Sequence, residues 1–249
     1  MKHFTLPKEG GLIETGIPSD ILHSYEKIRT EIYDQSTTAS EVIADTIIDA
    51  INASKEKTFK LGLSTGVTPV SLYKWLTRKY QEGKVSFKNV EVYSIDEYYP
   101  YGKGEPQSRN RILHTSLLNA VDIKEENIHI PDGSVPGDKI SAYCEEYDKM
   151  ARNLDMLVIG MGEAGQVGFN EAGTTLSSRT RTVLLSYQSR KRQGKNFNGD
   201  FKHTPSEAIT VGIDTMMSAK KIILMAWGED KANAVKQVVE HKADSDFPA

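Results

Sequence analysis

Two carboxylates, Asp96 and Glu97, directly follow an apolar run that ends at Ile95. Solvation alone does not explain acidic side chains in this place, and a strand can hold a carboxylate so that it points at a ligand. A carboxylate held in that way can serve as a general base. We therefore expect Asp96 to carry chemistry and its neighbour to be structural, capping the following turn.

A second candidate is the small-residue turn formed by Thr65, Gly66, Val67 and Thr68, which follows an apolar run and precedes a helical pattern. Pro69 suits the first helical position and Thr68 the cap before it. Free backbone N–H groups and the helix dipole would then face the turn, which favours an anion. No lysine follows, so the turn is not a Walker A loop. The alternative is a tight connection without any ligand.

A third candidate is a glycine turn in which Gly160, Gly162 and Gly165 match G-x-G-x-x-G. Alone, this match is typical of a dinucleotide-binding domain, which we keep as an alternative. The context weakens it, because further glycines interrupt the helix that should follow. In addition, no acidic residue for a ribose occurs near positions 180–186.

The segment Phe169-Asn170-Glu171 follows this glycine turn and supplies a further carboxylate. Alone, Asn-Glu in a loop is usually solvated surface. The candidate segments nevertheless all come just after apolar runs, and ligands of parallel sheets bind beyond the carboxyl ends of the strands. We therefore expect Glu171 to lie at the same edge as Asp96.

The elements that must position these residues alternate along the chain between apolar strands and amphipathic helices. This alternation predicts a three-layer α/β/α sandwich with a mostly parallel, Rossmann-like sheet. The expected strands are 61–63, 90–95, 156–161, 183–185, 209–211 and 222–227, and the expected helices include segments from Thr38, from Pro69, over 140–150 and over 232–239.

The chain divides into an N-terminal arm and lead-in segment, residues 1–37, and one α/β domain, residues 38–249. The first twenty residues show no sustained periodicity, whereas Thr38 and Glu41 have capping-box spacing before an apolar helical face. The sequence stops soon after a helix and without a closing strand. We therefore expect the α/β domain to be incomplete at its C-terminus.

Composition excludes several classes of function. The 249 residues carry 31 Lys+Arg against 34 Asp+Glu, so the electrostatic attraction that nucleic-acid binding needs is lacking. No apolar run approaches the ~20 residues that span a bilayer, and the N-terminus lacks a signal-peptide core, so we expect no membrane partner and a cytoplasmic location. The single Cys144 cannot form an intramolecular disulfide or a cysteine-based metal site, and packing is its expected role.

Taken in order, these motifs resemble those of the glucosamine-6-phosphate deaminase/isomerase family. Its L-G-L-P-T-G-x-T-P resembles residues 61–69, with Ser64 in place of the proline, and its D-E-Y resembles residues 96–98. Its F-N-E and S-R-T-R resemble residues 169–171 and 178–181. The similarity extends over roughly residues 38–240 without a large gap.

The resemblance implies an aldose–ketose isomerisation coupled to loss of the amine, which gives fructose 6-phosphate and ammonia without a metal or organic cofactor. Asp96 would move a proton between C2 and C1, and Glu171 would help to orient the catalytic machinery. The phosphate would bind at the 65–68 turn and Lys231. Lys195 stands where the family usually has an arginine, so it loses the bidentate fork. A small sugar phosphate is the expected partner and a homo-oligomer the expected assembly.

One departure from the family concerns ring opening. The family has G-x-G-x-D-G-H, in which the Asp orients the His, whereas this chain has Ala164 and Gln166 at those positions. Gln166 can hydrogen-bond the ring oxygen of a sugar but cannot exchange a proton at neutral pH.

Three hypotheses follow. The chain is an isomerase/deaminase with altered ring opening, a relative that acts on a different or already open sugar phosphate, or a non-catalytic sugar-phosphate-binding module. Retention of Asp96 and Glu171 favours an enzyme, since a binding module has no need of the base.

Overall fold

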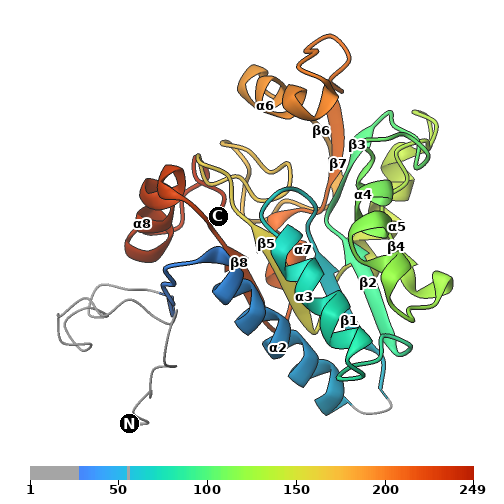
Figure 1. The fold of residues 1–249 in the computed structure, drawn as a ribbon. Coiled ribbons are helices and arrows are strands. Elements are labelled where there is room, and N and C mark those ends of the chain that lie inside the picture. Colours follow the sequence, from blue (N-terminus) through green and yellow to red (C-terminus); the bar gives the residue numbers. More distant parts are fainter. Residues whose placement is uncertain (1–27, 55–56) are drawn as a thin grey trace.

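A five-stranded parallel sheet in the order β4-β2-β1-β5-β8 forms the centre of the computed structural model, which describes residues 28–54 and 57–249 (Figure 1). All four ladders of this sheet are parallel, which confirms the predicted sheet type. Its strands are β1 (Phe59–Leu63), β2 (Val90–Ser94), β4 (Ile128–His129), β5 (Met156–Gly160) and β8 (Ile222–Met225).

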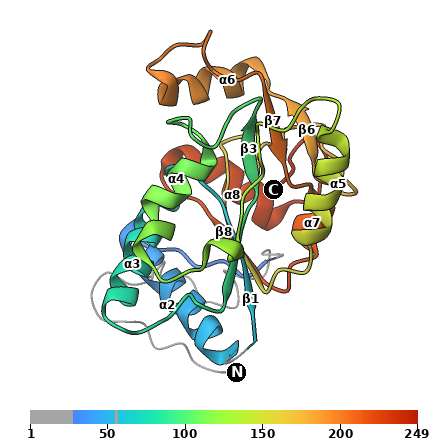
Figure 2. The same ribbon diagram turned by 90° about the vertical axis from the view of Figure 1, so that its right-hand side faces the viewer.

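Helices cover both faces of the central sheet, as Figure 2 shows. On one face, α2 (Ser36–Ser54), α3 (Val70–Gln81) and α4 (Arg109–Ser116) share an apolar core with residues of β1 and β2. On the other, α5 (Ile140–Met150) and α7 (Ile213–Met217) pack with Leu157 and Ile159 of β5. Burial of apolar area on both faces explains the continuous apolar strands. The three-layer α/β/α prediction is confirmed.

A second, antiparallel sheet in the order β3-β7-β6 stands beyond the carboxyl edge of the first. Its strands are β3 (Asp96–Tyr99), β6 (Arg181–Leu184) and β7 (Glu207–Thr210). The sequence predicted strands near positions 183 and 209 but not this separate sheet. The two sheets meet at Ile95, whose N–H donates to Leu63 and whose carbonyl accepts from Val211. Asp96, the next residue, therefore lies where the chain leaves the central sheet.

The remaining described elements are α6 (Tyr187–Gln193), α8 (Ala232–Glu240) and four short 3-10 helices, η1 (Leu118–Ala120), η2 (Glu125–Asn127), η3 (Gly194–Phe197) and η4 (Glu229–Lys231). Cys144 on α5 is buried in accordance with its predicted packing role. No helix in the described ranges is both long and apolar enough to cross a membrane.

Two predicted helix starts were wrong by a residue or two. Helix α2 begins at Ser36 rather than at Thr38. Before α3 the cap position is taken by Pro69, which has no side chain to accept a hydrogen bond, and not by Thr68. Residues 1–27 of the predicted N-terminal arm lie outside the described residues.

Candidate active site

The strand register brings the turns after β1 and β5 into contact. Leu63 of β1 pairs with Ser94 of β2 on one side and with Val158 of β5 on the other. One residue further on, the Ser64 hydroxyl accepts a hydrogen bond from the Gly160 N–H at 3.2 Å. A side chain at position 160 would lie about 3.1 Å from Cβ of Thr68. The predicted convergence of the two turns at one sheet edge is confirmed.

The backbone N–H groups of the 65–68 turn donate no hydrogen bond to any described residue. Gly66 has a φ of 130°, a conformation that favours glycine, and Val67 is 88% exposed. The Trp227 indole donates to the Thr68 carbonyl at 2.9 Å, which ties the turn to the end of β8. Unpaired N–H groups ahead of α3 fit an anion.

Asp96 is buried, with 4% of its surface exposed. Its Oδ2 lies 3.5 Å from the place that a Cβ on Gly168 would occupy, so the segment that carries the predicted Phe-Asn-Glu motif reaches Asp96. Burial raises the pKa of the Asp96 carboxyl, and the nearby Arg109 guanidinium and Thr65 hydroxyl lower it in part. A carboxylate with a raised pKa binds a proton more tightly, as a general base must.

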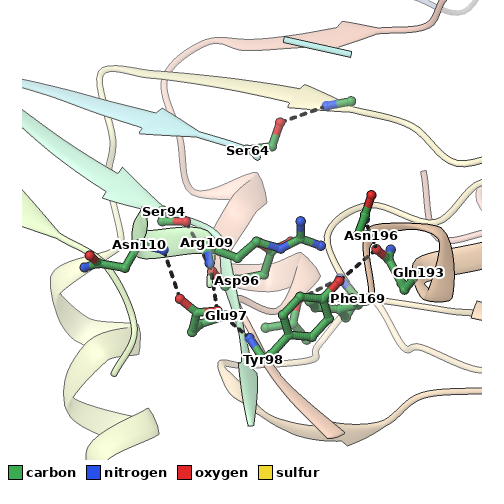
Figure 3. A network of polar contacts seen from close by, with 12 residues as sticks. Ser64, Ser94, Asp96, Glu97, Tyr98, Arg109, Asn110, Phe169, Gln193 and Asn196 are labelled. Atoms are coloured by element: carbon green, nitrogen blue, oxygen red, sulfur yellow. Dashed lines mark hydrogen bonds and ion pairs between the residues drawn. The ribbon is translucent and has the colours of Figure 1, made fainter. Parts of the chain in front are cut away.

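Glu97 has the structural role predicted for one member of the acidic pair. Its carboxylate accepts hydrogen bonds from the N–H groups of Arg109 and Asn110 at 2.9 and 3.0 Å, and from the Tyr98 N–H at 2.8 Å (Figure 3). Burial raises the pKa of Glu97 to about 7 although these donors lower it. Glu97 thus caps the start of α4 rather than facing the site.

Arg109 is a residue that the sequence analysis missed. Its guanidinium lies above the Tyr98 ring at 4.7 Å and the Phe169 ring at 5.3 Å, and its Nε is 3.5 Å from Asp96 Oδ1 (Figure 3). Arg109 lies in a polar stretch without periodicity, 13 residues after Asp96. No local signal separates it from Arg111, which is exposed on the same helix.

The Phe-Asn-Glu segment is held mainly by Asn170, which is fully buried. Its amide donates to the carbonyls of Val167 and Val211 at 3.0 and 2.8 Å, and its oxygen accepts from Arg181 at 3.1 Å. Glu171 accepts from the Ser186 N–H at 3.3 Å, at the start of α6. Glu171 is therefore tied to α6, and its orienting role stays a prediction.

Gln166 is folded back onto its own turn. Its Oε1 accepts a hydrogen bond from the Ala164 N–H at 3.1 Å, and the Gly162 N–H donates to its backbone carbonyl. Only the amide NH₂ of Gln166 is left to donate to a ligand. No helix follows within residues 161–180, so the glycine turn lacks the helix that a dinucleotide fingerprint requires. The dinucleotide alternative was wrong in this respect.

The two predicted phosphate lysines lie in different surroundings. Lys231, whose side chain is 16% exposed, is 3.8 Å from Glu163 of the glycine turn and 3.5 Å from Asp230. It therefore lies at the carboxyl edge of the sheet, as predicted, and the two carboxylates partly neutralise its charge. The side chain of Lys195 on η3 is exposed and makes no hydrogen bond or ion pair with another described residue. The structure does not bring Lys195 into contact with the 65–68 turn.

Unpaired buried polar atoms are concentrated at this site. Six buried side-chain polar atoms of the described residues have no hydrogen-bond partner, and four of these six belong to site residues, namely Thr65 Oγ1, Asp96 Oδ1, Arg109 Nε and Glu171 Oε1. Buried polar groups in folded proteins are nearly always paired, so such a concentration fits a polar ligand. In the described part of the chain, no three His, Cys, Asp or Glu side chains are grouped so that they could hold a metal.

Comparison with known proteins gives a consistent result. The family model of glucosamine-6-phosphate isomerases/6-phosphogluconolactonase matches residues 34–249. A glucosamine-6-phosphate deaminase of Lysinibacillus sphaericus is 37% identical over 225 residues, which covers 89% of this chain and 92% of that protein. A solved structure of a monomeric glucosamine-6-phosphate deaminase superposes with a TM-score of 0.81 at 33% identity, covering 86% of this chain and 88% of that one.

A longer relative is also similar. A glucosamine-6-phosphate deaminase-like protein of Bacteroides thetaiotaomicron is 36% identical over 242 residues. The match covers 95% of this chain but 36% of that protein, so the chain spans about a third of the length of this relative.

Proposed function

We propose an enzymatic function for this chain, which belongs to the family of glucosamine-6-phosphate isomerases and 6-phosphogluconolactonases. The proposed reaction is isomerisation and deamination of an aminosugar 6-phosphate, with glucosamine 6-phosphate as the first candidate and fructose 6-phosphate and ammonia as products. The observation that carries the proposal is the buried Asp96 carboxylate, which lies at the carboxyl edge of the sheet close to the 65–68 turn, where we expect an anion to bind.

The phosphate would bind at the 65–68 turn. Its unpaired N–H groups supply directed donors, and Lys231 supplies charge from the end of η4. Because Lys231 lies near Glu163 and Asp230, the phosphate would compete with these carboxylates for the ammonium group. Lys195 would add charge only if the α6–η3 segment moved toward the turn.

Asp96 would remove the proton at C2 of the open-chain aldehyde and return it to C1. As C1 is protonated, the nitrogen lone pair forms the C2=N bond, and the amine gives up a proton while O1 takes one up, which leaves an imine at C2 and a hydroxyl at C1. Water then adds to C2 and the nitrogen leaves as ammonia, which gives the ketose. The raised pKa of Asp96 suits a group that must accept the proton and hold it between the two steps.

Ring opening is the step with the weakest support. No side chain at positions 164 and 166 can exchange a proton at neutral pH, and the Gln166 oxygen is already bound by its own turn. We therefore expect slow turnover of cyclic substrates and faster turnover of sugar phosphates that are already open. A binding module without turnover is the second candidate function, and it is favoured by the lack of a proton-exchanging side chain at positions 164 and 166.

The test of the proposed function is release of ammonia and fructose 6-phosphate from glucosamine 6-phosphate, measured with coupled assays. A thermal shift measured in parallel separates binding from catalysis. A ligand at ~100 times its dissociation constant adds about 2.7 kcal/mol to the free energy of unfolding. Lys231→Ala should abolish this shift, whereas Lys220→Ala, which removes an exposed lysine paired with Asp155, should not.

Three outcomes are decisive. Product release supports the enzyme, and a thermal shift without product from cyclic or open substrates supports the binding module. The absence of both with several hexose phosphates at millimolar concentration would rule out the sugar-phosphate site.

We also propose that the chain forms a homo-oligomer. Support comes from β6, an edge strand of the small sheet, where Leu184 is 79% exposed and the nearby Tyr187 is 64% exposed. Analytical ultracentrifugation measures this directly. A single monomeric species at micromolar concentration would contradict the proposal, and the structural relative described above is itself monomeric.

A further inference from the structure

Arg109 is a buried cation beside Asp96, the proposed base. The proton transfer described above assigns no role to this arginine. It is the first residue of α4, and its backbone is fixed because its N–H donates to Glu97 at 2.9 Å. The helix start is fixed independently, since the Ser108 hydroxyl accepts from the Arg111 N–H at 3.1 Å. The Arg109 side chain is therefore not needed to hold its own helix in place.

The guanidinium is held by ring faces instead of by hydrogen bonds. It lies 4.7 Å from the Tyr98 centroid and 5.3 Å from the Phe169 centroid, and the Tyr98 hydroxyl is in turn fixed by Gln193 at 2.8 Å (Figure 3). Cation–π contact with two rings stabilises the cation and leaves the edge of its plane, where all N–H groups lie, without a hydrogen-bond partner among the described residues.

These N–H groups are unused in the described part of the chain. Arg109 Nε has no hydrogen-bond partner, and no hydrogen bond there involves either Nη. The Nε atom is buried, so water does not replace its missing acceptor, and only 5% of Arg109 as a whole is exposed. Asp96 Oδ1, 3.5 Å from Arg109 Nε, is likewise without a hydrogen-bond partner. A purely structural buried arginine would have its donors satisfied.

We propose that Arg109 is a catalytic residue that donates hydrogen bonds to the oxyanion formed at O1 when Asp96 takes the C2 proton. In this step the electron pair of the C2–H bond forms the C1=C2 double bond, and the π pair of the C1 carbonyl moves to O1. The proton resides on Asp96 until it is returned to C1. As the nitrogen lone pair then forms the C2=N bond, the amine gives up one proton and O1 takes one up, which discharges the oxyanion. This inference rests on the proposed function and adds the group that stabilises its intermediate.

The chemistry of the arginine side chain fits this role. The intermediate is planar and carries its charge on oxygen, and the guanidinium offers planar, directed donors in a site with little water. The cation also lies beside the base, since Arg109 Nε is 3.5 Å from Asp96 Oδ1, and it lowers the pKa of Asp96 against the effect of burial. One side chain would therefore keep the base ionised and stabilise the charge that its action creates.

The experiment compares two acyclic probes by isothermal titration calorimetry. The first is a five-carbon aldonohydroxamic acid 5-phosphate, whose planar anionic end mimics the intermediate. The second is a hexitol 6-phosphate, which shares the phosphate and hydroxyl groups but has no planar oxyanion. The variants are Arg109→Lys, which keeps the charge but loses the fork, and Arg109→Gln. Arg111→Gln is the matched control, because Arg111 lies two residues further along the same helix and is exposed.

The unmodified chain should bind the hydroxamate about 10- to 100-fold more tightly than the hexitol phosphate, as expected for charge-assisted hydrogen bonds. Both Arg109 variants should lose most of this preference while their affinity for the hexitol phosphate changes less than about threefold. Turnover should fall through kcat with KM nearly constant, because the lost contact exists only in the transition state. Arg111→Gln should keep the preference.

Several results would overturn the inference. One is an Arg109→Lys variant, folded by circular dichroism, that keeps the full preference for the hydroxamate, and another is an equal loss of affinity for both probes. If the unmodified chain binds the hexitol phosphate without preferring the hydroxamate, the inference fails while the sugar-phosphate site stands. If it binds neither probe, the proposed function fails as well.

Discussion

Two buried carboxylates of this chain, Asp96 and Asp148, each lie beside an arginine, but their surroundings differ. Asp148 on α5 accepts hydrogen bonds from Arg179 at 2.7 Å and from the Thr180 N–H and hydroxyl at 2.8 and 2.9 Å, and the Thr215 hydroxyl also donates to it. Its acceptors are satisfied. Asp96 has one oxygen with no hydrogen-bond partner among the described residues.

The pKa values of the two carboxyl groups differ in the same sense. Burial raises the pKa of Asp148, but the hydrogen bonds from Arg179, Thr215 and Thr180 outweigh it and lower the pKa to about 2. For Asp96, burial outweighs the effects of Arg109 and Thr65, and the pKa is raised. The comparison teaches that a carboxylate whose oxygens all accept hydrogen bonds holds segments of the chain together. A buried carboxylate with an unused oxygen is free to bind a proton or a ligand.

The largest expected effect concerns turnover at the site that contains Asp96. Replacing Ala164→Asp and Gln166→His together should raise turnover of cyclic glucosamine 6-phosphate by ~10²-fold or more, because an oriented imidazole can move a proton to the ring oxygen. Either change alone should do little, since the pair acts as a unit. Adding Asp96→Asn should remove the gain. A double variant that binds the sugar phosphate but stays inactive would favour the binding module.

The next effect contrasts the stability of two matched variants in urea. Asp148→Asn should lower the free energy of unfolding by about 2 kcal/mol at neutral pH, because it removes the charge that Arg179 and two threonines stabilise. Asp96→Asn should leave this free energy unchanged or raise it, since burial already disfavours the Asp96 charge. If Asp96→Asn destabilises the chain more than Asp148→Asn does, the claim that Asp148 stabilises the fold and Asp96 does not is contradicted.

The pH dependence of stability should carry the signature of Asp148. Its folded-state pKa lies below the ordinary value of 3.8, so its contribution is present above pH 3.8 and is lost as the pH falls toward about 2. Over this range the chain should lose about 2 kcal/mol through this group alone. Urea denaturation at a series of pH values checks this. In Asp148→Asn the free energy of unfolding should fall less steeply with decreasing pH. An identical slope in both proteins would refute the assignment.

Much of the site could be predicted because its residues follow strands. Apolar runs locate strand ends, parallel strands share one carboxyl edge, and these two facts suffice to place the 65–68 turn and Asp96 together. The same reasoning predicted that one of the acidic pair would be structural, which Glu97 confirms.

Other features depend on contacts that no local pattern encodes. Arg109 reaches Asp96 because Glu97 fixes the start of α4 across a polar loop, and the loop itself has no periodicity. The separate antiparallel sheet depends on the choice of strand partners, since β3 pairs with β7 rather than with any sequence neighbour. Gln166 could not be placed because its side chain accepts from its own turn instead of facing outward.

The most direct test of the central claim is solvent-proton exchange at the substrate, followed by NMR in D₂O with glucosamine 6-phosphate. The unmodified chain and Asp148→Asn should place solvent deuterium at C1 of the ketose product, because Asp96 exchanges the proton that it carries from C2. Asp96→Asn should reduce this incorporation by ~10²-fold or more. Equal deuterium incorporation by Asp96→Asn and the unmodified chain would contradict the assignment of Asp96 as the base.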